Sequence, residues 1–336
     1  ILQEDSIIVM AHLGPRAFET IGGEVVQTTS FVIRKQNSLN FQGRYVRLVD
    51  YNTAEEKKVA LLNGDNRHRA DQQDFSKIPG SPIAYWVNNK ILYSFLKGIP
   101  LENIATPRQG LTTSDNHKYI RLWFEVERKK VNLEYSDNLS TKVQKWFPLN
   151  KGGKFRKWYG NLGHIVDYEN NGERIKQTVI EKYSYLNGNP DFVVKNQGLY
   201  FKKGISWTAI TSGSFSVRLN PSGCIFSSAG MAAFPIDKFA EVFAFMNSKV
   251  FATMLAAISQ TLNFNAGDIG KINLHSQIQT NNELLIKFIA ISKSDWDLRE
   301  TSWDFRRSPL LTDYSAPKIE TVIDENLTDW SWPSAF

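Results

Sequence analysis

The chain has 336 residues but a single cysteine, Cys224, and this scarcity excludes two common ways of stabilising a fold. One thiol cannot close a disulfide within the chain, and it cannot supply a cysteine-rich zinc site. No run of about 18 apolar residues is present, so no segment is predicted to span a membrane. A charged-then-apolar leader is missing as well. We therefore expect a cytoplasmic protein without membrane contact.

Catalytic motifs are also missing. None of the five histidines has the HExxH spacing of a metal site, and neither a P-loop nor a GxSxG elbow occurs. The histidines are His12, His68, His117, His164 and His275. Asn189-Pro190-Asp191-Phe192 differs from the Asn-Pro-Pro-Tyr/Phe tetrapeptide of amino-methyltransferases at its second proline and follows a turn signal. We interpret it as a turn, and we predict no metal site and no catalytic residue in this chain.

The net charge of +6 is unevenly distributed. Residues 290–336 contain 5 of the 40 basic residues and 9 of the 34 acidic ones, so residues 1–289 contain 35 and 25 and carry +10. A basic body favours a polyanionic partner. The first residue is Ile1 rather than Met, and the last residues end in mid-pattern, so we expect a piece of a longer protein.

The N-terminal 50 residues have the pattern of strands. Residues 6–10 and 45–49 predict short strands, and the β-branched run 25–33, after a turn at Gly22-Gly23, predicts a strand buried on both faces. Residues 52–75 are polar and compatible with a helix, which we expect to break at Asn63-Gly64.

The residue composition and the spacing of apolar residues then change twice along the chain. Residues 100–235 are rich in Gly, Asn, Ser and aromatics, with short apolar runs between turns, as in an irregular, mostly β domain. After Pro235, apolar residues recur at helical spacing from Phe239 to Ile258, with Asp237 as the expected cap, and a second helix is expected over 282–292. The sequence therefore predicts an α+β fold class.

The strongest functional indication is the stretch 141–159, TKVQKWFPLNKGGKFRKWY. It contains six basic residues, interleaved aromatics and no acid, and Gly152-Gly153 allows a partner to approach the backbone closely. Lysine and arginine neutralise phosphates, and aromatic rings stack on bases or wedge between them. The alternative is a solvated charged loop whose aromatics belong to the core.

Two further stretches, 106–121 and 200–218, combine basic, hydroxyl and amide or aromatic side chains that suit base edges and phosphate oxygens. We predict phosphate contacts for Lys142, Lys145, Lys151, Lys154, Arg156, Lys157, Lys202 and Lys203. We predict base or groove contacts for Arg108, Gln109, Asn116, Lys118, Arg121, Trp158, Trp207 and Arg218.

Together these stretches resemble one family over nearly the whole chain. The run 18–32, FETIGGEVVQTTSFV, resembles the closing strands of the methyltransferase domain in the BREX phage-defence adenine methyltransferases, the PglX family. Further matches follow in family order: PGSPIAYW at 79–86, PRQGL at 107–111, KWFP at 145–148, NKGG at 150–153, FRKWYGN at 155–161, GISW at 204–207, NSK at 247–249, TLNF at 261–264 and GDI at 267–269.

The resemblance implies a catalytic domain followed by a target-recognition domain like that of TaqI-type restriction-modification methyltransferases. Residues 1–50 would be the terminal strands of the methyltransferase sheet, 51–75 a connection, 76–235 the mostly β recognition domain, 236–300 helices packed on it, and 301–336 the start of a linker. Family members transfer methyl from S-adenosylmethionine to adenine N6. The methyl-donor loop and the Asn-Pro-Pro-Tyr/Phe tetrapeptide would precede Ile1, so this chain is expected to bind no cofactor and to be inactive alone.

The resulting prediction is sequence-specific recognition of double-stranded DNA, in phage defence or restriction-modification. Other components of such a defence or restriction system are possible further partners. Two alternatives remain open. One is a specificity subunit of a multi-subunit restriction enzyme. Two recognition domains separated by long helices would support it, and the sequence shows only one. The other is a β-domain that binds glycans through its Trp and Tyr side chains.

Overall fold

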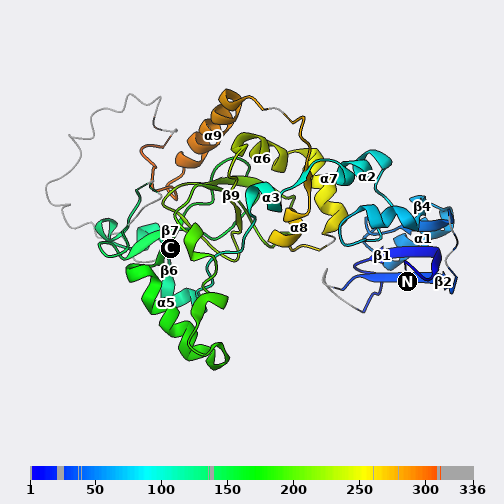
Figure 1. The fold of residues 1–336 in the computed structure, drawn as a ribbon, viewed down its shortest axis with the longest axis horizontal. Coiled ribbons are helices and arrows are strands. Elements are labelled where there is room, and N and C mark those ends of the chain that lie inside the picture. The colour runs from blue at the N-terminus through cyan, green and yellow to red at the C-terminus, as the bar shows by residue number, and fades with distance from the viewer. Residues whose placement is uncertain are drawn as a thin grey trace.

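The computed structural model describes residues 2–20, 26–36, 38, 40–134, 136, 140–259, 261–278, 280–308 and 311. It is a mixed α+β structure, as predicted. A four-stranded N-terminal sheet lies at one end of the long axis of the molecule, and a second four-stranded sheet with helix α5 (Glu169–Lys182) lies at the other (Figure 1). Between them a three-stranded sheet packs against most of the helices.

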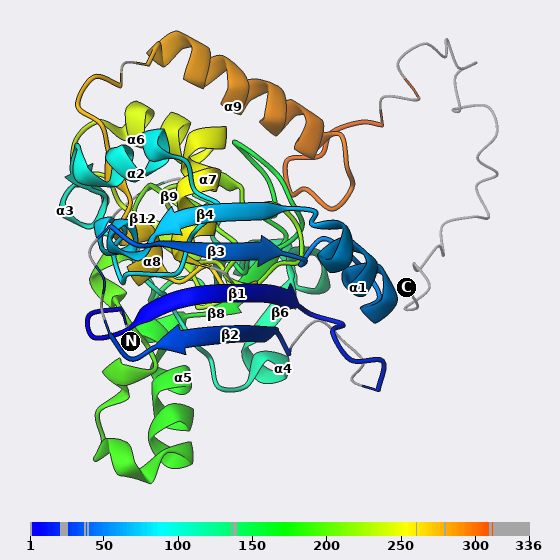
Figure 2. The same cartoon turned by 90° about the vertical axis from the view of Figure 1, so that its right-hand side faces the viewer.

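The N-terminal sheet has the strand order β2-β1-β3-β4, with β1 and β3 parallel and the other pairs antiparallel (Figure 2). Its strands are β1 (Ser6–Gly14), β2 (Thr28–Arg34), β3 (Gln42–Arg47) and β4 (Arg67–Asp71). The strands predicted at 6–10 and 45–49 are confirmed at β1 and β3, with shifted ends. The predicted turn at Gly22-Gly23 lies outside the described residues.

The expected burial of residues 25–33 on both faces is wrong. Phe31 and Val32 are 56% and 55% exposed, because β2 is an edge strand and no described element covers it. Helix α1 (Ala54–Asn63) begins with a capping box made by Thr53 and Glu56. It ends at Gly64, whose φ of 82° is the left-handed conformation that glycine adopts readily, so the predicted break is confirmed.

The segment that follows joins the N-terminal sheet to the rest of the molecule. It runs through the 3₁₀ helix η1 (Gln72–Lys77), and the Tyr85 ring then stacks on Tyr45 of β3 at 4.8 Å. Trp86 packs against both the N-terminal core and the central core. The aromatic pair thus fixes the sheet against the body of the protein.

The central core is built on the antiparallel sheet β10-β9-β12. Its strands are β9 (Gly204–Trp207), β10 (Val217–Asn220) and β12 (Ala232–Ala233). Helices α2 (Asn89–Leu96), α3 (Glu102–Ala105), α6 (Phe239–Met246), α7 (Lys249–Ile258), α8 (Ala266–Gly270) and α9 (Asn282–Asp297) contribute apolar side chains, and the short pair β5 (Ile99–Pro100) and β13 (Asn273–Leu274) closes one side.

The single helix expected after Pro235 is two helices, α6 and α7, bent by 69°. The break has a physical cause, because the Asn247 side chain leaves the helix to bind the main chain of Val217, accepting from its N–H at 3.2 Å and donating to its carbonyl at 3.0 Å. Ser248 then caps α7 by accepting from the N–H of Phe251. Asp237 is not the cap of α6; the helix follows Lys238, without a side-chain cap. Helix α9 is longer than the predicted 282–292.

The distal sheet has the order β11-β7-β8-β6 and its own core, against which α5 packs Ile175 and Val179. Its strands are β6 (Ile120–Leu122), β7 (Trp146–Asn150), β8 (His164–Asp167) and β11 (Ile225–Phe226), preceded by helix α4 (Asn116–Tyr119). Short 3₁₀ helices connect them: η2 (Trp123–Glu125), η3 (Arg128–Lys130), η4 (Ser184–Leu186), η5 (Pro190–Phe192) and η6 (Gln197–Leu199). Pro190 and Phe192 form a tight turn, as predicted for that segment.

Candidate nucleic-acid interface

Five segments far apart in the sequence line one open groove with a cavity volume of about 950 Å³. We call it the basic groove. Its lining residues are Gln109, Lys151, Gly153, Lys154, Thr208, Ala209, Ile210, Thr211, Ser212, Ser228, Ala229, Met231, Leu262, Asn263 and Asn265. The groove therefore combines parts of all three stretches singled out in the sequence with residues 228–231 and the segment around Asn263.

The loop at residues 151–154, which we call the glycine loop, follows the fully buried strand β7. Gly152 and Gly153 have φ values of 80° and 140°, in the region that favours glycine. A Cβ atom on Gly152 would lie 2.7 Å from the carbonyl oxygen of Ala229. The hydroxyl of Thr208 donates to the carbonyl of Gly153 at 2.9 Å. Close packing on both sides thus needs glycine here and holds the loop at the groove.

The groove is positively charged. Among the described residues, no Asp or Glu lines it, and neither Lys151 nor Lys154 forms an ion pair or a side-chain hydrogen bond. The charge reaches neighbouring groups: the pKa of His164 is lowered, first by burial and then by the charge of Lys151. Hydroxyl and amide side chains from Thr208, Thr211 and Asn263 complete a surface suited to an anionic polymer.

Gln109 is held at the edge of the groove by its neighbours. The main chain of Arg108 pairs with Ala232 of β12, at 2.7 and 3.1 Å. The carbonyl of Gln109 accepts from Asn196 at 2.8 Å, and its side-chain Oε1 accepts from Lys195 Nζ at 3.3 Å. A glutamine fixed in this way has the donor and acceptor needed to read an adenine edge. Arg108 is exposed and donates to the carbonyl of Pro107.

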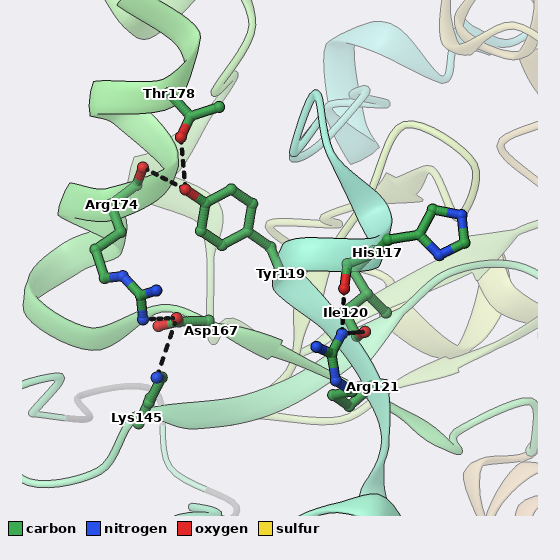
Figure 3. A network of polar contacts seen from close by, with 8 residues as sticks. All are labelled: His117, Tyr119, Ile120, Arg121, Lys145, Asp167, Arg174 and Thr178. Atoms are coloured by element: carbon green, nitrogen blue, oxygen red, sulfur yellow. Dashed lines mark hydrogen bonds and ion pairs between the residues drawn. The ribbon is translucent and has the colours of Figure 1, made fainter.

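A second group of predicted contacts lies around α4, α5 and the distal sheet, and none of its members lines the basic groove (Figure 3). Lys145 Nζ lies 3.7 Å from Asp167, which also accepts from Arg174 at 2.6 Å. Arg121 donates to the carbonyls of His117 and Ile120. These cations hold α5 and α4 to the sheet.

Three more side chains of this group are exposed to solvent and make few contacts with the protein. Lys118 is exposed and reaches Thr178 Oγ1 at 3.3 Å, while Asn116 accepts from Thr113 Oγ1 at 2.7 Å. Lys142 is exposed. Lys202 and Lys203 are exposed elsewhere, and Lys203 lies 4.7 Å from the centre of the Phe239 ring.

The basic aromatic stretch divides sharply after Phe155. Arg156 pairs with Asp295 of α9 and lies over the Trp296 ring, and Lys157 donates to the carbonyl of Asn247 at 2.7 Å. Trp158 packs against Phe243 and Phe288, both at 5.3 Å. These three side chains bind the stretch to the helices, so the structure gives no support to their predicted DNA contacts.

Trp207 and Arg218 are completely buried. The Trp207 indole N–H donates to the carbonyl of Phe264 at 2.9 Å inside the central core. Side chains without exposed surface cannot touch a base, which corrects the groove contacts expected for both. The reason is that side chains alternate along strands β9 and β10 and both faces of these strands are covered. One face packs on the central core, and a neighbouring segment covers the other.

The sequence reasoning missed Lys195, Thr208, Thr211, Asn263 and Asn265 as site residues. The hydroxyl-rich run 208–216 and the TLNF motif were visible signals, but neither indicates which side chains face the same groove.

A second cavity of about 410 Å³ meets the basic groove at Leu262. It lies between His12, Arg47 and Trp86 on one side and α7 on the other. The pKa of His12 is lowered, mainly by burial and next by Arg47. Within the described ranges, no cluster of three His, Cys, Asp or Glu side chains could hold a metal ion. In the same part of the chain, no single helix is long and apolar enough to cross a membrane. Helices α6 and α7 meet both conditions only when they are taken together, and they are bent at their junction.

Comparison with known proteins gives no matching family model. The chain is 38% identical over 337 residues to the adenine-specific methyltransferase PglX of Lacticaseibacillus casei (strain Zhang), covering 96% of this chain and 28% of PglX. It is 38% identical over 319 residues to the adenine-specific methyltransferase BrxX of Escherichia coli O9:H4 (strain HS), covering 93% and 25%. The chain thus spans about a quarter of the length of the curated relatives it matches.

Among solved structures, the Type IIL restriction-modification enzyme MmeI in complex with DNA aligns with a TM-score of 0.43 and 8% identity, over 90% of this chain and 39% of MmeI.

Proposed function

This chain corresponds to a segment of the adenine-specific methyltransferases PglX and BrxX, and we propose that it is the part of such an enzyme that reads the DNA sequence. The basic groove binds double-stranded DNA. The observation that carries the proposal is the convergence in one groove of unpaired lysines, hydroxyls, amides and Gln109, with no carboxylate among the described lining residues.

Each kind of side chain has a distinct role. Lys151 and Lys154 neutralise backbone phosphates, which gives affinity but no sequence information. Gln109, Asn263 and Asn265 present the donor and acceptor pairs that distinguish base edges. The hydroxyls of Thr208, Thr211 and Ser212 suit phosphate oxygens or bases.

Residues 1–50, with strands β1 to β3, would be the terminal part of a methyltransferase sheet. Strand β4, in the segment 51–75 that was expected to be a connection, pairs with β3 and belongs to the same sheet. The methyl transfer itself, with S-adenosylmethionine as donor and adenine N6 as acceptor, is proposed for the longer protein. The Asn-Pro-Pro-Tyr/Phe tetrapeptide of that chemistry is not in this sequence. This chain would select the site at which the reaction occurs.

Fluorescence polarisation with a labelled duplex tests the proposal. We expect affinity that falls steeply between about 50 and 200 mM salt, with a slope of several units of log K per log salt. An oligosaccharide array measured in the same buffers is the comparison, because glycan binding depends little on salt. No duplex binding at low salt, or glycan binding that is insensitive to salt, would overturn the proposal.

A further inference from the structure

The floor beneath the glycine loop is a buried polar layer. In β9 and β10, Ile205, Trp207 and Val217 point into the central core. Their neighbours Ser206, Arg218 and Asn220 point to the opposite face, because side chains alternate along a strand. Residues 150–153 lie on that face: Asn150 donates to Asn220 at 3.3 Å, and the carbonyl of Gly153 accepts from Thr208. The main chain of Trp158 pairs alongside β10, at the edge of the sheet.

Arg218 in this layer carries a charge that no described Asp or Glu pairs with. Its side chain is completely buried, and Nη2 donates to Thr208 Oγ1 at 3.2 Å. Nε and Nη1 have no hydrogen-bond partner among the described residues. Burial lowers the pKa of the guanidinium to about 10, so it stays protonated at neutral pH. A buried cation with two unsatisfied donors is costly for the fold alone.

Thr208 connects this cation to the glycine loop. Its hydroxyl accepts from Arg218 and donates to the carbonyl of Gly153 at 2.9 Å. The backbone N–H groups of Gly153 and Lys154 make no hydrogen bond in the part of the chain that the structure describes. Free backbone amides, flanking ammonium groups and a charge beneath them are the components of protein oxyanion sites.

We propose that the glycine loop is a discrete phosphate site and that Arg218 is its positioning residue, supplying the charge beneath it and orienting the loop through Thr208. The ligand is a phosphodiester of the bound DNA, so the inference rests on the proposed function. The same chemistry accepts inorganic phosphate. The unsatisfied guanidinium then lowers the stability of the free protein, because the site is complete only when the anion is bound.

The substitution Arg218→Met, which keeps the length and removes the charge, tests the proposal. We expect the melting temperature of the free protein to be unchanged or higher, since replacing a buried charge by an apolar side chain is often neutral or stabilising. DNA affinity should fall about ten- to hundredfold, and the salt slope should shrink by about one unit. Lys58→Met, on the exposed face of α1 away from the groove, removes one charge in the same way. It should leave the melting temperature, the DNA affinity and the salt slope unchanged.

A purely structural Arg218 gives the opposite pattern, a lower melting temperature with an unchanged salt slope, and that result overturns the proposal. If Arg218→Met does not fold, Thr208→Val replaces it. This variant keeps all charges but cuts the connection to Gly153, and it should also weaken duplex binding. Full duplex affinity in Thr208→Val contradicts the proposed connection.

Inorganic phosphate separates this inference from the proposed function. Sodium phosphate should raise the melting temperature of the wild type above that in sodium chloride of equal ionic strength. The gain should disappear in Lys151→Gln/Lys154→Gln, whereas a general salting effect persists there. If the wild type responds to phosphate but binds no duplex, only the DNA function fails. If it binds duplex but neither phosphate nor Arg218→Met has an effect, only the phosphate site fails.

Discussion

Lys195 donates a hydrogen bond from Nζ to the side-chain Oε1 of Gln109 at 3.3 Å, across 86 residues of sequence. Asn196 beside it holds the carbonyl of Gln109 at 2.8 Å. The turn after η5 therefore orients a side chain on the wall of the basic groove. A preoriented amide loses less conformational freedom on binding a base, which favours discrimination.

Replacing Gln109 should relax sequence preference. We expect Gln109→Ala to reduce the free-energy gap between the preferred duplex and a single-base mismatch by about 1–3 kcal/mol at one position. Lys195→Met should reduce the same gap by less, because Gln109 stays but is no longer oriented. Competition binding with a library of duplexes measures both. Unchanged preference in Gln109→Ala would remove this residue from the readout.

Charges within the basic stretch should act differently on either side of Phe155. Lys151→Gln/Lys154→Gln should lower affinity for all sequences alike and reduce the salt slope by about two units, since each phosphate contact contributes about 0.9. Lys157→Gln removes one charge from the same stretch and is the control, because the wild-type Lys157 ammonium binds the carbonyl of Asn247. It should lower the urea midpoint and leave the salt slope unchanged. Equal slopes in the two variants would contradict the placement of the groove.

Asp167 should matter for stability rather than binding. Its side chain is 3% exposed and is paired with Arg174 at 2.6 Å and Lys145 at 3.7 Å (Figure 3). Asp167→Asn should lower the free energy of unfolding by about 1–3 kcal/mol, because it removes the charge that both cations pair with. The loss stays in this range because both cations are exposed enough to be hydrated again. Urea denaturation measures the change, and duplex binding by the folded variant should be normal. A loss of more than tenfold in DNA affinity would place this network at the interface.

Acidification should destabilise the protein partly through His12. Burial and Arg47 lower the pKa of His12 below its usual 6.5, so just below pH 6.5 the unfolded state binds more protons than the folded state. The stabilisation is complete above that pH and is lost as the pH falls through it. The urea midpoint should drop between about pH 7.5 and about pH 5.5, and by less in His12→Asn.

Some of this drop should remain in the variant, because His68 and His164 also have lowered pKa values and contribute with the same sign. An equal drop in both proteins would show that His12 is not the titrating group.

The elements that sequence patterns predicted well are those fixed by local chemistry. Gly64 ends α1 because a left-handed residue suits glycine, and the strand β1 follows its β-branched, apolar run. The break between α6 and α7 was missed because it depends on Asn247 binding Val217, 30 residues away. The exposure of Phe31 was missed because an apolar strand does not show whether anything covers it.

The candidate site follows the same division. The sequence determined that the chain cannot close an internal disulfide, carries a basic excess and resembles one methyltransferase family, since composition and motifs are properties of the chain alone. Only the tertiary structure decided that Lys151 and Lys154 face a groove while Lys157 binds a helix end and Arg218 lies beneath the loop. Basic residues of one stretch differ in their surroundings because different neighbours cover them. Those neighbours come from distant parts of the chain.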